Sequence, residues 1–64
     1  MTHLDLSPRI DDPDRLYAAL VEAHEGLDEA ASLRLQARII LLLANHIGST
    51  ATVCAAIDEA RRFG

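Results

Sequence analysis

The stretch RIILLLANHIG, residues 38–48, decides the fold of this chain. Six consecutive apolar residues, 39–44, lie within a segment that carries helix signals at both ends. Successive residues of an α-helix are about 100° apart, so six in a row point apolar side chains in every direction. A single covered face cannot account for them. The stretch therefore predicts a helix that is covered on more than one side.

Extended outward, this helix is predicted over residues 29–47, with Asp28 as its N-cap and Gly48 as the residue that ends it. Its helical wheel has two apolar faces and a narrow polar stripe formed by Arg34, Arg38 and Asn45. The first face consists of Leu33, Ala37, Ile40, Leu41, Ala44 and Ile47. The second face consists of Leu35, Ile39, Leu42 and Leu43, with His46 at its end.

A shorter helix is predicted before it, over residues 13–25. Asp12 is a suitable N-cap, Pro13 suits the first helical position, and Gly26 can take the positive φ with which a chain leaves a helix. The connection to Asp28 is short, so the two helices are expected to form an antiparallel hairpin.

A third short helix is predicted over residues 50–62, capped by Ser49 or Thr50, with an exposed ion pair between Asp58 and Arg62. The predicted fold is thus all-α, a helical hairpin plus a third helix, in a single domain over residues 12–64. Residues 1–11 are too short for a helix and are expected to form an extended arm.

Each shorter helix has one apolar stripe, and both stripes are expected to cover the first face. The stripes are Leu16, Ala19, Leu20, Ala23 and Leu27, and Val53, Ala56, Ile57 and Ala60. The second face has no partner within the chain, and its burial would contribute several kcal/mol at about 25 cal/mol per Å². We therefore expect a homodimer or higher oligomer, with a second copy of the 29–47 helix on this face, parallel or antiparallel. The predicted interface residues are Leu35, Ile39, Leu42, Leu43 and His46.

An alternative cover for the second face is the arm, through Leu4, Leu6 and Ile10. The arm could fold back over its own chain or wrap a neighbouring copy. Three separate aliphatic residues are few for this task, so the second copy is the preferred expectation.

Composition excludes several classes of protein. The 64 residues carry a net charge of −4 without a basic cluster, which argues against nucleic-acid binding. No apolar window approaches the roughly 20 residues of a membrane span, and the first residues do not resemble a signal peptide, so a cytoplasmic protein is expected. Cys54 is the only cysteine and is expected to pack as a small apolar residue.

No catalytic, cofactor-binding or metal-binding group emerges from the sequence, and a non-enzymatic protein is expected. His24 shares one side of its helix with Tyr17, as a boundary residue would. His46 lies near a helix C-terminus, where positive charge is favourable, and is expected to cap the helix or to form an interface hydrogen bond. As an alternative, His46 and His24 of different subunits could line a small-ligand or metal site.

Two segments carry a family resemblance: DDPDRLYAALVEAHEGL, residues 11–27, and SLRLQARIILLLANHIG, residues 32–48. They resemble the bacterial family grouped as domain of unknown function 2783, short proteobacterial chains. The resemblance implies a helical bacterial protein and no particular activity. The expected function is a non-enzymatic homo-oligomeric interaction or accessory subunit, whose polar stripe and arm could contact a larger protein partner.

Overall fold

Three α-helices make up the fold of this chain in a computed structural model that describes residues 4–63. They are α1 (Pro13–His24), α2 (Glu29–Ile47) and α3 (Thr50–Phe63), and no strand occurs within the described range. The all-α prediction with three helices is confirmed. Residues 4–12 precede α1 without regular secondary structure, and the first three residues of the predicted arm lie outside the described part of the chain.

The helices begin at the predicted caps. The carboxylate of Asp12 accepts a hydrogen bond from the backbone N–H of Arg15 at 3.1 Å, and that of Asp28 accepts one from Ala31 at 2.8 Å. The hydroxyl of Ser49 accepts the corresponding bond at the start of α3, at 3.2 Å. Each cap satisfies a backbone donor that has no partner inside the helix.

The helix ends follow the two glycines. Gly48 has φ 76° and its N–H donates to the carbonyl of Ala44 at 2.9 Å, which closes α2 where predicted. Helix α1 ends one residue earlier than predicted, because Glu25 already has an extended backbone while its N–H donates to Glu22. Gly26 then takes φ 76°, a conformation that other residues rarely adopt.

Helix α3 ends at Phe63, one residue beyond its predicted end. Its ion pair joins Arg62 to Glu59, with Nη1 and Oε2 3.4 Å apart, in place of the predicted pair with Asp58. Positions three residues apart are neighbours on a helix just as positions four apart are, and the longer glutamate side chain reaches the guanidinium.

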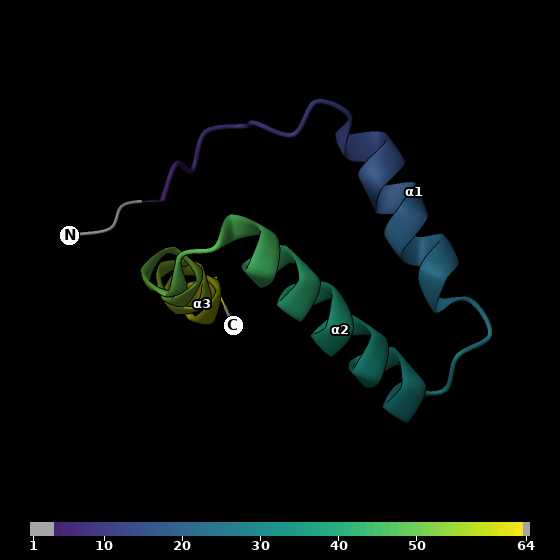
Figure 1. The fold of residues 1–64 in the computed structure, drawn as a ribbon. Helices are drawn as coiled ribbons and strands as arrows, with labels where there is room; N and C mark the ends of the chain where they lie inside the picture. The colour runs from purple at the N-terminus through teal and green to yellow at the C-terminus, as the bar shows by residue number, and fades with distance from the viewer. Residues whose placement is uncertain (1–3, 64) are drawn as a thin grey trace.

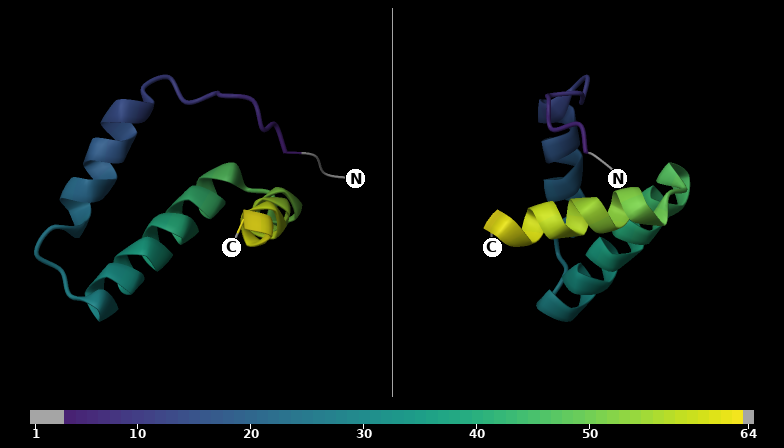
Figure 2. Two further views of the ribbon diagram at one scale, coloured as in Figure 1. Left: turned by 180° about the vertical axis from the view of Figure 1, so that it is seen from behind. Right: turned by 90° about the vertical axis from the view of Figure 1, so that its left-hand side faces the viewer.

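The three helices form an open arrangement (Figures 1 and 2). Helix α3 crosses the end of α2 at a steep angle, and this is the one pair of helices in residues 4–63 with more than isolated contact. Helix α1 runs back in roughly the opposite direction to α2 but diverges from it beyond the turn. The two helices therefore form an opened hairpin. The expected close packing between them is absent because their axes spread apart with distance from the turn.

The predicted intrachain core is wrong, since no side chain among residues 4–63 is buried. Leu20, in the stripe of α1, remains 38% exposed, and Leu33 and Ile40, on the first face of α2, remain 59% and 57% exposed. The radius of gyration is 13.4 Å, whereas a compact chain of this length has about 11 Å. The chain thus has well-formed helices without a core of its own.

Candidate interaction surface

The second face of α2 is open over its C-terminal half. Leu35 and Ile39 are half-buried, whereas Leu42 is 72% exposed, Leu43 is 58% exposed and His46 is exposed. The face predicted to receive a second copy is therefore partly covered within the chain, and the first face is left more open than expected.

A polar contact explains which side of α2 the end of α1 approaches. The amide Nε2 of Gln36 donates to Nε2 of His24 at 3.2 Å. Gln36 lies between the two apolar faces on the helical wheel and opposite the polar stripe. The end of α1 therefore lies between the faces rather than over the first one. No local pattern in the sequence predicts this contact, because it joins two helices across a turn.

The ring of His24 has both nitrogens engaged inside its own chain. Nδ1 donates to the backbone carbonyl of Leu20 at 2.6 Å, and Nε2 accepts from Gln36. These roles correspond to a neutral imidazole with its proton on Nδ1. A metal ion could bind Nε2 only after displacing Gln36. His46 is exposed, and its ring makes no hydrogen bond to any of the residues that the structure describes.

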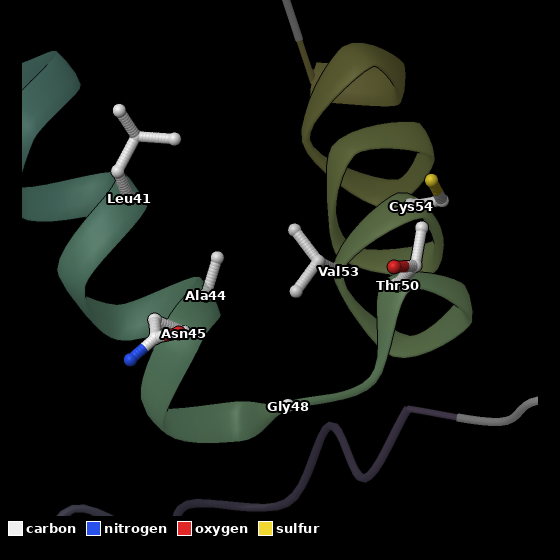
Figure 3. A pocket seen from close by; sticks show the side chains of 7 residues that line it. All are labelled: Leu41, Ala44, Asn45, Gly48, Thr50, Val53 and Cys54. Carbon is white, nitrogen blue, oxygen red and sulfur yellow. The ribbon is translucent and has the colours of Figure 1, made fainter.

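The corner between α2 and α3 contains two shallow hollows, one on either side of Val53. The larger, about 520 Å³, is shown in Figure 3, where Val53 projects from α3 toward α2. It is lined by Leu41, Ala44, Asn45, Gly48, Thr50, Val53 and Cys54. The smaller, about 150 Å³, is lined by apolar residues alone: Ile40, Leu43, Ala44, Ile47, Val53 and Ala56. This corner brings Leu43, a predicted interface residue, beside α3.

Cys54 is exposed at the rim of the larger hollow, so the expected packing of its side chain is not seen in the single chain. Within residues 4–63, no three His, Cys, Asp or Glu side chains are grouped so that they could hold a metal ion. The lining of the smaller hollow suits apolar contact.

The segment before α1 is organised around Asp5. Its carboxylate accepts hydrogen bonds from the hydroxyl and the backbone N–H of Ser7, and these bonds hold the pKa of Asp5 below its usual value. The guanidinium of Arg9 lies 3.4 Å from the same carboxylate. Leu4 is half-buried, but Leu6 and Ile10 remain 69% and 58% exposed. The segment therefore does not cover the second face of α2 in its own chain.

The charges on α2 have no partners on the neighbouring helices. Arg34 and Arg38 form no ion pair with any described residue, and the two ion pairs of residues 4–63 lie in the N-terminal segment and in α3. The polar stripe predicted from the sequence is present as a line of exposed residues. It borders the first apolar face, which is the larger open surface.

No helix in the described part of the chain is both long enough and apolar enough to cross a membrane. No protein of curated function matches the sequence, and no solved structure matches it. A family model does match, over residues 4–62, which takes in all three helices almost completely. The chain belongs to the family described as Protein of unknown function (DUF2783).

Proposed function

We propose that this protein is a cytoplasmic, non-enzymatic interaction subunit that acts as a homo-oligomer assembled through α2. The observation that carries the proposal is the absence of a buried side chain among residues 4–63. Its single cysteine has no disulfide partner in the chain, in keeping with a reducing compartment.

The solvent-exposed area of the chain supports an assembly in which each copy is covered by one partner. The chain exposes 5851 Å², whereas a compact monomer of 7.0 kDa exposes about 4,000 Å². The excess is about 1,800 Å² per chain. Obligate homodimer interfaces bury about 2,000–5,000 Å² in total, or half of that per partner. The excess area therefore matches what one obligate partner would cover.

The kind of surface supports the same conclusion. Most of the large exposed apolar residues are aliphatic and lie along the helices, as they do where helices pack. Fixing the backbone costs about 1–2 kcal/mol per residue, and folding offsets this cost mainly by burying apolar area. The described residues of a single copy bury no side chain. Association with a second copy would bury apolar area and so provide the stabilisation that the single chain lacks.

The test is the mass of the purified protein across a dilution series, with helicity followed in parallel by circular dichroism. We expect a multiple of 7.0 kDa at micromolar concentration, and a loss of helicity on dilution. The double variant Leu33→Glu and Ile40→Glu, on the open first face of α2, should lose both the mass and the helicity.

A matched control places two glutamates on the polar stripe instead, through Arg38→Glu and Asn45→Glu, and should keep the wild-type mass. A wild-type protein that is monomeric, fully helical and cooperatively folded at every concentration would contradict the proposal. The alternative of a ligand or metal site between His24 and His46 has no specific observation in its favour, since His24 is already engaged.

A further inference from the structure

We infer that two copies of the chain pair through α2 in antiparallel orientation, with Leu33 of each copy seated in the α2–α3 corner of the other. The inference rests on the proposed function and specifies how the oligomer is built. It places the second copy on the first apolar face rather than on the partly covered second one.

The first argument is the size of the side chains on α2. Large residues recur every seven positions in one row, which consists of Leu33, Ile40 and Ile47, and these are 59%, 57% and 53% exposed. Alanines recur every seven positions in the adjacent row, which consists of Ala30, Ala37 and Ala44. Residues seven apart lie on nearly the same side of a helix, so the two rows run side by side.

The pairing direction decides which sizes meet. In an antiparallel pair centred between residues 38 and 39, each large residue meets an alanine: Leu33 meets Ala44, Ile40 meets Ala37, and Ile47 meets Ala30. In a parallel pair each residue meets its own counterpart, so large residues hold the helices apart and leave voids at the alanines. Protein interiors are close-packed and voids destabilise them. The alternation of sizes therefore favours the antiparallel pair.

The second argument is the apolar hollow in the corner. In the antiparallel register, Leu33 of the second copy lies opposite Ala44, which lines that hollow together with Val53. The hollow measures about 150 Å³ and has no polar residue in its lining, which suits one large aliphatic side chain. The corner that α3 forms with α2 thus provides a socket for a residue that its own chain leaves exposed.

The third argument is charge. Helix α2 begins with Asp28 and Glu29 and has His46 in its last turn. Antiparallel pairing brings the acidic start of one helix toward the basic end of the other and opposes the two helix dipoles. Parallel pairing would bring the two acidic starts together, and would place Arg34 beside Arg34 of the second copy. Like charges in such positions destabilise the pair.

The test uses single cysteines in a Cys54→Ser background and a short bismaleimide crosslinker, which spans one helix-to-helix separation but not three turns of helix. Copies carrying Leu33→Cys and copies carrying Ala44→Cys are unfolded together, refolded and crosslinked. We expect a covalent dimer from the mixture and none from either variant alone, because equivalent positions are then about 17 Å apart along the axis.

Two controls accompany the mixture. Ala37→Cys lies near the centre of the pair and should crosslink to itself, whereas Arg38→Cys, on the polar stripe, should not. Self-crosslinking of Leu33→Cys and of Ala44→Cys would show parallel pairing and overturn the inference. A dimeric mass without crosslinks at position 37 would also overturn it but leave the proposed function intact. A monomeric wild-type protein would overturn both.

Discussion

The α2–α3 corner and the α1–α2 turn are built from similar parts but end in different packing. Both contain a glycine at φ 76° followed by a capping side chain, Gly48 with Ser49 and Gly26 with Asp28. At the corner the contact is apolar and Val53 is half-buried. At the turn the defined contact is the polar one between His24 and Gln36. Satisfied helix ends therefore do not by themselves bring apolar faces together.

The largest expected effect concerns α1, whose stripe is uncovered in the single chain. If assembly covers this stripe, Leu20→Ala should lower the free energy of unfolding by about 2–5 kcal/mol, since it would leave a cavity. Urea denaturation at a fixed micromolar concentration would measure it. Tyr17→Ala, at a residue that is 71% exposed, serves as the control and should cost at most about 0.5 kcal/mol. An equally small effect of Leu20→Ala would leave α1 outside the interface.

The two glycines offer a direct comparison of the turns. Alanine at φ 76° costs about 1–2 kcal/mol in backbone strain, and an added Cβ meets nothing within 4 Å at Gly26 and only the Asn45 carbonyl oxygen, at 4.0 Å, at Gly48. Gly26→Ala and Gly48→Ala should therefore lower the thermal midpoint by similar amounts. If Gly26→Ala left the midpoint unchanged, the α1–α2 turn would have to adopt another backbone in the assembled protein.

The α2–α3 corner is expected to contribute less to the free energy of unfolding. Val53→Ala removes about two methylene equivalents from a half-buried position, which should cost about 1 kcal/mol. The matched control is Cys54→Ala at the neighbouring exposed position, with a cost below about 0.5 kcal/mol. A Val53→Ala variant as stable as the control would show that α3 does not hold its position against α2.

The smallest effect concerns the N-terminal segment and pH. The pKa of Asp5 is lowered by its bonds from Ser7, so these bonds favour the ionised carboxylate. Their contribution is present above the unfolded pKa of about 3.9 and is lost as pH falls through the lower folded value. Protection of the Ser7 amide proton, meaning the intrinsic exchange rate at each pH divided by the observed rate, should therefore fall in acid, and Asp5→Asn should remove that dependence. The helices should not respond, because the segment contacts none of them through these groups.

The starts and ends of the helices could be predicted from the sequence because capping residues and glycines act on the backbone close to them. Asp12, Asp28 and Ser49 cap the helices as predicted, and Gly48 ends α2 at the predicted residue. These features depend on residues within one turn of each other. Even the misplaced end of α1 differs by a single residue, where Glu25 leaves the helical conformation just before Gly26.

The packing could not be predicted from the same information. The two apolar faces of α2 predict that other helices pack against them, but the helical wheel does not identify which helix packs on which face. The actual approach of α1 depends on the extended backbone of Glu25 and on the contact of His24 with Gln36, twelve positions later. The interface residues 35, 39, 42, 43 and 46 remain a prediction, since their partners would lie in another chain.

The lack of a buried side chain among residues 4–63 also bears on how the protein would be maintained in a cell. Proteases act on segments that open, and the described part of a single copy has no buried core to keep its helices closed. Copies that find no partner would be degraded quickly, while assembled copies would persist. Under the proposed pairing, which would depend on concentration, the steady-state level would rise more steeply than the rate of synthesis. Assembly would thus set the lifetime of the protein as well as its shape.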